Sequence, residues 1–246
     1  PLIFLREKLP TETAIVWQHH GGGFPQWYSR TFYKAGFNVV DSFLFTSQEI
    51  AQYWKKQNLI NEFQEVHEVI ESSSTFQPRD KQLCRSQLGL KGEEIFLWVG
   101  RLDENKDPLI VIKGFHKALP NFREAHLYMI FHEGNLLNEV QRLISSLGLS
   151  DRIHLLGKQS HELLEQFYSA ADFFILGSHH EGSGFALLES LACGVVPIVT
   201  DIPPFRKITN NGEIGALWSV GAAESCASAI VKATHKKQSR ESVRTY

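Results

Sequence analysis

Short apolar runs recur along the chain, and stretches with helical spacing separate most of them. The runs occupy residues 14–18, 38–46, 94–100, 126–131, 152–157, 172–177 and 195–200. They are continuous rather than alternating, which is typical of strands covered on both faces of a parallel sheet. Helical patterns occupy residues 107–119, 135–148, 160–170, 185–193 and 222–234. This order, with right-handed crossovers, predicts an α/β fold with a doubly wound parallel sheet.

Two local signals set boundaries along the chain. In the pattern 135–148, apolar residues recur at spacings of three and four, and Gly148 follows as a helix stop. The segment 71–80, ESSSTFQPRD, is the least patterned part and predicts a linker between domains. We therefore expect a first domain with its linker over residues 1–75 and a second domain over residues 76–246.

Composition excludes several classes of function. The formal net charge is −2, so no basic surplus points to a nucleic acid as partner. The three cysteines are scattered, which favours reduced thiols in a cytoplasmic protein over disulfides or a metal site. No apolar run approaches the roughly 18 residues that a membrane-spanning helix needs.

A glycine loop between two glutamates, EGSGFALLE at 181–189, follows one predicted strand and opens a predicted helix. Gly184 allows a tight turn and the close approach of a ligand, and the free amides at a helix start near Phe185 attract phosphate. Glu189 falls in an apolar run, where a carboxylate is costly unless it accepts hydrogen bonds. A ribose diol would supply them. The other interpretation is that Glu189 meets a backbone N–H or an arginine elsewhere in the chain.

A second loop, VGRLDENKD at 99–107, places Arg101 and Lys106 after a predicted strand. Ligands bind outside the carboxyl ends of strands in open parallel sheets, and two cations there would neutralise a diphosphate. The other interpretation is a solvated loop in which Arg101 pairs with Asp103 or Glu104.

A third segment, WQHHGGGFP at 17–25, ends a predicted strand with His19 and His20. Histidine donates to sugar hydroxyls and moves protons near neutral pH. Neighbouring strand residues point to opposite faces, so this pair makes a poor metal chelate. The other interpretation is one core and one surface histidine. No spacing in the sequence matches a structural zinc site, and we expect neither a metal nor a cofactor.

Together these segments resemble the retaining nucleotide-sugar glycosyltransferases of family four, which have the GT-B architecture of two Rossmann-like domains. The resemblance covers roughly residues 40–225. It is carried in order by VGRLDENKD, by HLLGKQSHELLEQFYSAADFFILGS and by EGSGFALLESLACGVVPIVTDIPPFRKITNNGEIGAL. Only 18 residues precede His19, fewer than in the family's first domain. The chain is therefore similar to a complete donor domain with a partial first domain, and activity is expected of the whole protein.

The resemblance implies a role for each matching residue. Arg101 and Lys106 would hold the donor diphosphate, and Glu189 would accept both ribose hydroxyls. The amides of Gly184 and Phe185 would cap phosphate or sugar oxygens. The donor sugar would face Glu181 and His20, with His19 as the alternative to His20. The catalytic set that this implies is Glu181, His20, Arg101 and Lys106.

The resemblance also implies partners: a UDP-, GDP- or ADP-sugar as donor, and a carbohydrate, lipid-linked or small-molecule acceptor. A peripheral membrane contact would come through the part of the first domain that these residues lack. Two other functions stay open on the same fold. One is a sugar-nucleotide epimerase or phosphorylase, and the other is a nucleotide-binding module without catalysis.

Overall fold

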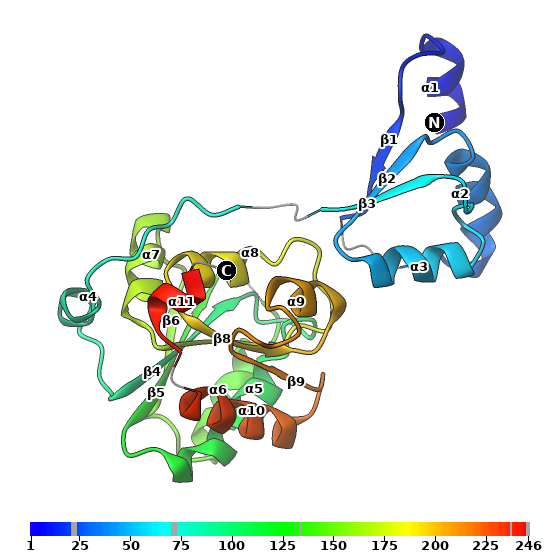
Figure 1. The fold of residues 1–246 in the computed structure, drawn as a ribbon. Helices are drawn as coiled ribbons and strands as arrows, with labels where there is room; N and C mark the ends of the chain where they lie inside the picture. The colour runs from blue at the N-terminus through cyan, green and yellow to red at the C-terminus, as the bar shows by residue number, and fades with distance from the viewer. Residues whose placement is uncertain (21–23, 70–72, 133, 237, 245–246) are drawn as a thin grey trace. The chain divides into compact units, whose positions relative to one another are not determined.

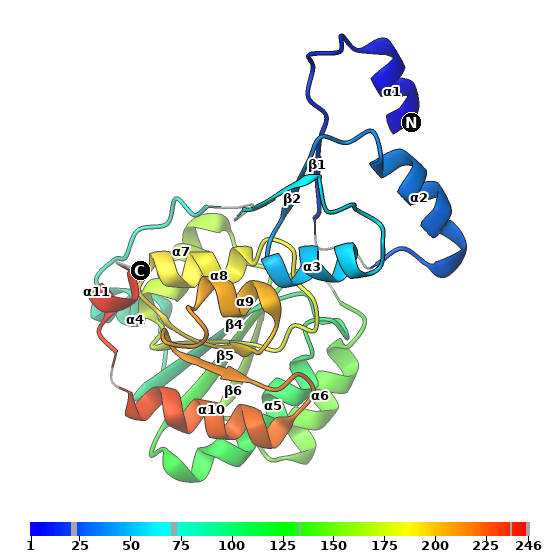
Figure 2. The same cartoon turned by 45° about the vertical axis from the view of Figure 1, so that its right-hand side comes forward.

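The computed structural model describes residues 1–20, 24–69, 73–132, 134–236 and 238–244. The chain divides into two compact units, residues 1–72 with 181–183 and residues 73–180 with 184–246. Figure 1 and Figure 2 show that each unit contains a sheet with helices packed against it. Among the described residues, no helix is long and apolar enough to cross a membrane.

The first unit is built on a parallel sheet of order β1-β2-β3. Its elements are α1 (Leu2–Lys8), β1 (Val16–Gln18), η1 (Trp27–Ser29), α2 (Arg30–Phe37), β2 (Ser42–Phe45), α3 (Gln48–Lys56) and β3 (Glu65–Glu68). Aromatic rings fill its core, where Phe37, Phe45 and Trp54 are each at most 4% exposed. Of the run predicted at 38–46, only Ser42–Phe45 form a strand, and Asp41 just before it accepts a 2.7 Å hydrogen bond from the Ile15 amide.

The second unit is built on a six-stranded parallel sheet of order β6-β5-β4-β7-β8-β9. Its strands are β4 (Glu94–Gly100), β5 (Ala125–Phe131), β6 (Ile153–Gly157), β7 (Phe173–Leu176), β8 (Val196–Thr200) and β9 (Ala216–Trp218). Its helices are α4 (Lys81–Leu88), α5 (Pro108–Ala118), η2 (Leu119–Asn121), α6 (Leu137–Ser146), α7 (His161–Ala170), α8 (Phe185–Ala192), α9 (Pro203–Ile208), α10 (Ala223–His235) and α11 (Arg240–Arg244).

Continuous apolar strands explain why this sheet is covered on both faces. Phe96, Trp98 and Phe174 are completely buried, and every residue of β8 is buried. All strand pairs are parallel, which confirms the doubly wound α/β fold. Gly148 follows α6 with φ +66°, as its predicted role as a helix stop requires.

The segment 71–80, predicted as a linker, contains the boundary between the two units at residues 72 and 73, but from Phe76 onward it packs on the second unit. Phe76 is 4% exposed and belongs to the core of the second unit. The Gln77 amide donates 2.8 Å to Glu165 on α7, and Arg79 pairs with the same carboxylate. Asp80 accepts from the Leu83 amide and caps α4. These partners lie more than 80 residues away except for the cap, so the local composition did not reveal them.

Candidate functional site

The strand order of the second unit places the two predicted ligand loops at neighbouring strands. The order runs one way from β4 through β5 to β6 and the other way from β7 to β9. β4 and β7 pair directly, with Phe96 opposite Phe173. In such sheets the crevice at the reversal point, outside the carboxyl ends of the strands, binds ligands. Arg101 and Lys106 follow β4, and α8 follows β7.

The loop after β4 carries its own counter-charge. Arg101 is exposed and makes a 2.9 Å ion pair with Asp103, as one of the two interpretations of this loop expects. Asp103 also accepts a 3.0 Å hydrogen bond from the Lys106 amide, which shapes the turn. The Lys106 side chain is half-buried. A bound diphosphate would therefore compete with Asp103 for Arg101.

Hydrogen bonds join this loop to the segment that follows β7. The His179 amide donates 2.8 Å to the Asn105 carbonyl. The Asn105 side chain bonds both the amide and the carbonyl of His180, at 3.0 Å each. His179 Nε2 lies 2.9 Å from a carboxylate oxygen of Asp107, which caps α5. No motif in the sequence pointed to these residues, whose hydrogen bonds fix the spacing of the two loops.

Gly177, which follows β7, allows the loop after β4 to approach the end of β7 closely. A Cβ there would lie 3.1 Å from the carbonyl oxygens of Lys106 and Asp107 and 3.0 Å from Val111 Cγ2. A side chain would therefore push the loop after β4 away from β7. The two loops are held by backbone contact rather than by flexible side chains alone.

The start of α8 is arranged as the glycine loop predicts. Gly184 is the N-cap of the helix with φ +64° and, as a glycine, offers no side chain of its own to cap the first turn. A Cβ on Gly184 would lie 3.1 Å from Ile208 Cδ1. Phe185, the first helical residue, is 57% exposed. The helix start carries the partial positive charge that favours an anion.

Glu189 lies on the second turn of α8, and a buried tyrosine holds it. The hydroxyl of Tyr168, on α7, donates a 3.0 Å hydrogen bond to Glu189 Oε2. Burial raises the pKa of Glu189, while the bond from Tyr168 and the nearby His161 lower it. Burial, followed by the Glu189 charge, raises the pKa of Tyr168, which therefore stays protonated as a donor. The partner is neither a backbone N–H nor an arginine, the two partners that the sequence analysis considered.

The remaining predicted residues are less constrained. Glu181 is half-buried in the loop between β7 and α8. His19 is 5% exposed and stacks on Phe45, with ring centroids 5.3 Å apart, whereas His20 is exposed. One core and one surface histidine is the second of the two interpretations of this pair, and it leaves His20 as the accessible one. The three glycines after His20 lie outside the described residues.

No group of three or more His, Cys, Asp or Glu side chains within the described ranges is placed to hold a metal ion. Metal independence nevertheless stays a prediction, because it concerns the bound donor. Cys84, Cys193 and Cys226 are free and buried, and burial raises the pKa of Cys193 to about 11. A thiol of that pKa is a poor nucleophile at neutral pH.

Comparison with known proteins defines the class. The family model described as glycosyl transferases group 1 matches residues 80–246, and the chain belongs to this family. Mannosylfructose-phosphate synthase of Agrobacterium fabrum is 32% identical over 127 residues, which cover 49% of this chain and 28% of that protein. D-Inositol 3-phosphate glycosyltransferase of Mycobacteroides abscessus is 30% identical over 159 residues, covering 63% and 35% respectively. The chain thus spans about a third of the length of these curated relatives.

Solved structures confirm the fold class as the GT-B type with Rossmann-like sheets. Sucrose-phosphate synthase from Thermosynechococcus elongatus superposes with a TM-score of 0.76 at 22% identity, covering 99% of this chain and 65% of that one. Anabaena HepE in complex with UDP and glucose gives a TM-score of 0.72 at 18% identity, covering 94% and 66%.

Proposed function

We propose that the whole protein transfers a glycosyl group from a nucleotide-diphosphate sugar to an acceptor, with retention at the anomeric carbon. The observation that carries the proposal is the pairing of β4 with β7 at the reversal point of the sheet. It puts a cationic loop and a helix start that follows a glycine at the same edge, where a diphosphate needs them. Family membership of residues 80–246 supports the same reaction class.

We assign the donor contacts residue by residue. Arg101 and Lys106 hold the diphosphate, and the amides of Gly184 and Phe185 cap its oxygens or those of the sugar. Glu189 accepts the ribose hydroxyls with the oxygen that Tyr168 leaves open. Glu181 and His20 contact the donor sugar, an assignment that follows from the family resemblance.

The reaction breaks the bond between the anomeric carbon and a diphosphate oxygen. The acceptor hydroxyl attacks from the face that the diphosphate leaves, and its proton passes to the departing oxygen. Charge grows on the diphosphate as it leaves, and Arg101, Lys106 and the α8 amides stabilise it. No step in this proposal uses a protein nucleophile or a metal ion. Donor binding and transfer should therefore survive EDTA, and strict dependence on Mg²⁺ or Mn²⁺ would contradict this mechanism.

Binding by this chain provides the first test. UDP, GDP and ADP at millimolar concentration should be compared by thermal shift, since a ligand that binds the folded state raises Tm. At least one of these nucleoside diphosphates should raise Tm, and the double variant Arg101→Ala with Lys106→Ala should abolish that rise. The small change in Tm caused by a nucleoside without phosphates should be the same in the variant. Lys117→Ala with Arg123→Ala removes two exposed cations elsewhere and serves as the control. No shift with any diphosphate on a folded chain would contradict the proposal.

Turnover requires the whole protein. Incubation with the donor that binds best, together with candidate acceptors, should give a glycoside whose anomeric configuration matches the donor's, as NMR would show. Donor binding without transfer or donor hydrolysis would instead identify a nucleotide-binding module. A cytoplasmic location and a peripheral membrane contact stay predictions of the sequence.

A further inference from the structure

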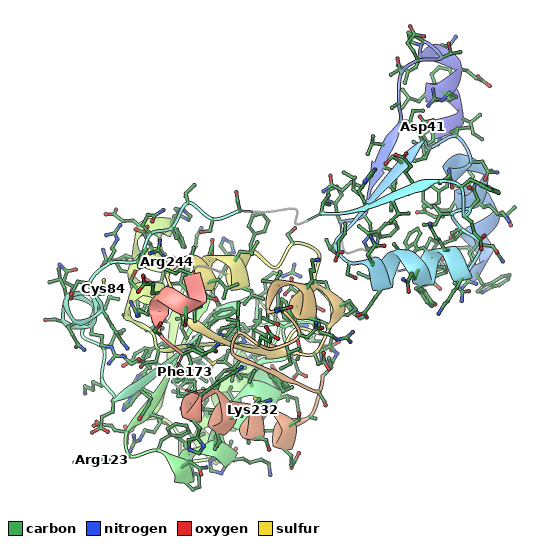
Figure 3. All side chains as sticks on the ribbon, viewed as in Figure 1. Asp41, Cys84, Arg123, Phe173, Lys232 and Arg244 are labelled. Carbon is green, nitrogen blue, oxygen red and sulfur yellow. The ribbon has the colours of Figure 1, made fainter. Side chains whose placement is uncertain are left out.

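A pocket with cationic side chains lies at the amino end of the sheet of the second unit. This is the edge opposite the loops proposed to bind the donor. A cavity of about 120 Å³ opens where β7 and β8 begin. Its polar lining includes Lys81 from α4, Asp172 before β7, Thr234 from α10 and Arg240 from α11. Figure 3 labels Phe173, the first residue of β7, which also lines it. The strands of this sheet are parallel, so neither Arg101 nor Glu189 belongs to this edge.

The charges around this pocket do not balance. Asp172 is the carboxylate in its lining, and it pairs with Lys81 and with Arg85, the latter at 2.5 Å. It also accepts a 2.7 Å hydrogen bond from the Ile95 amide. Arg240 contributes a third cation, and the charge of Asp172 raises the pKa of Arg240 against the effect of burial. Lys81 and Arg240, the two cations in the lining, outnumber its one carboxylate, so the lining carries an excess of one positive charge.

Arg240 presents its unused donors to this space. Its Nη2 donates to the Ser169 carbonyl and, at 2.9 Å, to the Ala171 carbonyl. Among the described residues, its Nε and Nη1 make no hydrogen bond. Burial lowers the pKa of Arg240, so its charged form is held at a cost in free energy. An anion in the pocket would offset that cost, because its oxygens would accept a hydrogen bond from a free N–H of the guanidinium and its charge would favour the charged form.

The backbone fixes this arrangement. Gly194 has φ +72°, and a Cβ on it would lie 2.8 Å from the Arg240 carbonyl oxygen. The chain after α10 can therefore lie against the start of β8 only because residue 194 is glycine. Lys81 Nζ has donors beyond the one that Asp172 takes, and the Thr234 hydroxyl, which donates 2.8 Å to Val231, keeps its acceptor lone pairs for water.

We propose that this pocket binds a tetrahedral oxyanion, either inorganic phosphate or the phosphate group of a phosphomonoester, between Lys81 and Arg240. The anion joins α4 to the segment that carries α11 and so fastens the end of the described chain to the sheet. It acts apart from the donor site and does not depend on the proposed function.

The test is a phosphate titration of the ¹⁵N-labelled full chain at constant ionic strength, followed by NMR. Phosphate should shift the amide signals of Gly194 and Thr234 in a saturable way. Binding should weaken by at least about tenfold in Arg240→Gln. It should stay within about twofold in the control Arg123→Gln, an exposed arginine of the same unit.

Three further arms keep the result unambiguous. The variant Arg101→Ala with Lys106→Ala should retain the shifts at Gly194, because phosphate at the donor loops would instead move Gly184 and Phe185. If Arg240→Gln does not fold, Lys81→Gln removes the opposite wall and should weaken binding equally. The same titration with glycerol 3-phosphate compares the affinity of a phosphomonoester with that of inorganic phosphate. The ligand with the higher affinity is the one that the pocket is built to bind. Shifts confined to Gly184 and Phe185, or unchanged affinity in both pocket variants, would overturn the proposal.

Discussion

The hydroxyl of Tyr168 donates a 3.0 Å hydrogen bond to Oε2 of Glu189, and it joins α7 to α8. It is the one hydrogen bond to the Glu189 carboxylate among the described residues, so Oε1 is left for a ligand. Tyr168 is completely buried, which fixes both its ring and the direction of its O–H. The tyrosine thus positions the carboxylate of Glu189 and stabilises its negative charge within an apolar helix.

Tyr168→Phe should weaken nucleoside diphosphate binding by about tenfold, in line with a lost hydrogen bond to a charged group. In this variant the affinity should also begin to fall at a higher pH as the solution is made more acidic. The bond lowers the pKa of Glu189 against burial, so its loss raises that pKa further and the ionised form is lost sooner as pH falls. Isothermal titration across pH would measure both effects. Weaker binding with an unmoved pH profile would mean that the phenol only fills space.

The two glutamates of the glycine loop should separate in function. Glu189→Gln should cost about 10- to 100-fold in affinity for ribonucleotides, whereas 2′- and 3′-deoxy analogues should bind poorly even to the unmutated chain. Glu181→Gln, the matched substitution, should spare free nucleotides and weaken the sugar nucleotide in the whole protein. Equal affinity for ribo- and dideoxy-ribonucleotides would remove Glu189 from this role.

Asp103→Asn should tighten diphosphate binding. The asparagine keeps an oxygen to accept from the Lys106 amide, so the turn survives, but it no longer neutralises Arg101. An exposed ion pair of this kind is worth about 0.2–1 kcal/mol, which predicts a gain of about 1.4- to fivefold. Affinity for the nucleoside without phosphates is the control and should not change. Weaker diphosphate binding in this variant would indicate that Asp103 itself contacts the ligand.

A histidine pair, with His126 buried and His154 half-buried, should make the second unit sensitive to acid. His126 Nδ1 lies 2.9 Å from His154 Nε2 across β5 and β6, and burial is the main cause that lowers the pKa of both. Below the unfolded value of about 6.5 the unfolded state binds more protons than the folded state. Stability is therefore full above that pH and is lost as pH falls through it.

His154→Phe should remove much of this acid sensitivity, so that Tm falls less between about pH 7.5 and about pH 5 than in the unmutated chain. The comparison uses the change of Tm with pH, because the substitution also alters packing. The variant His116→Asn replaces an exposed histidine and should leave the slope as it is. An identical slope in His154→Phe would show that the pair is not the source.

Local patterns in the sequence determined the strands β4 to β8 and the helices α5, α6, α7, α8 and α10 of the second unit. The apolar runs at 94–100 and 195–200 fall on β4 and β8, and the glycine stop after α6 lies where the pattern puts it. These features depend on residues a few positions apart, which periodicity records. The charged and glycine-rich loops were visible for the same reason, because each follows the end of an apolar run.

Only the tertiary structure decided which of these loops face one another. The strands β3 and β9 were not predicted, because EVHE is largely polar and ALW is short, and each is a strand through its neighbour in the sheet. The direct pairing of β4 with β7 joins residues more than 70 positions apart, as does the bond from His179 to Asn105. The hydrogen bond between Tyr168 and Glu189 depends on two helices packing together. No local pattern encodes such contacts, because their free energy comes from burial and pairing between distant segments.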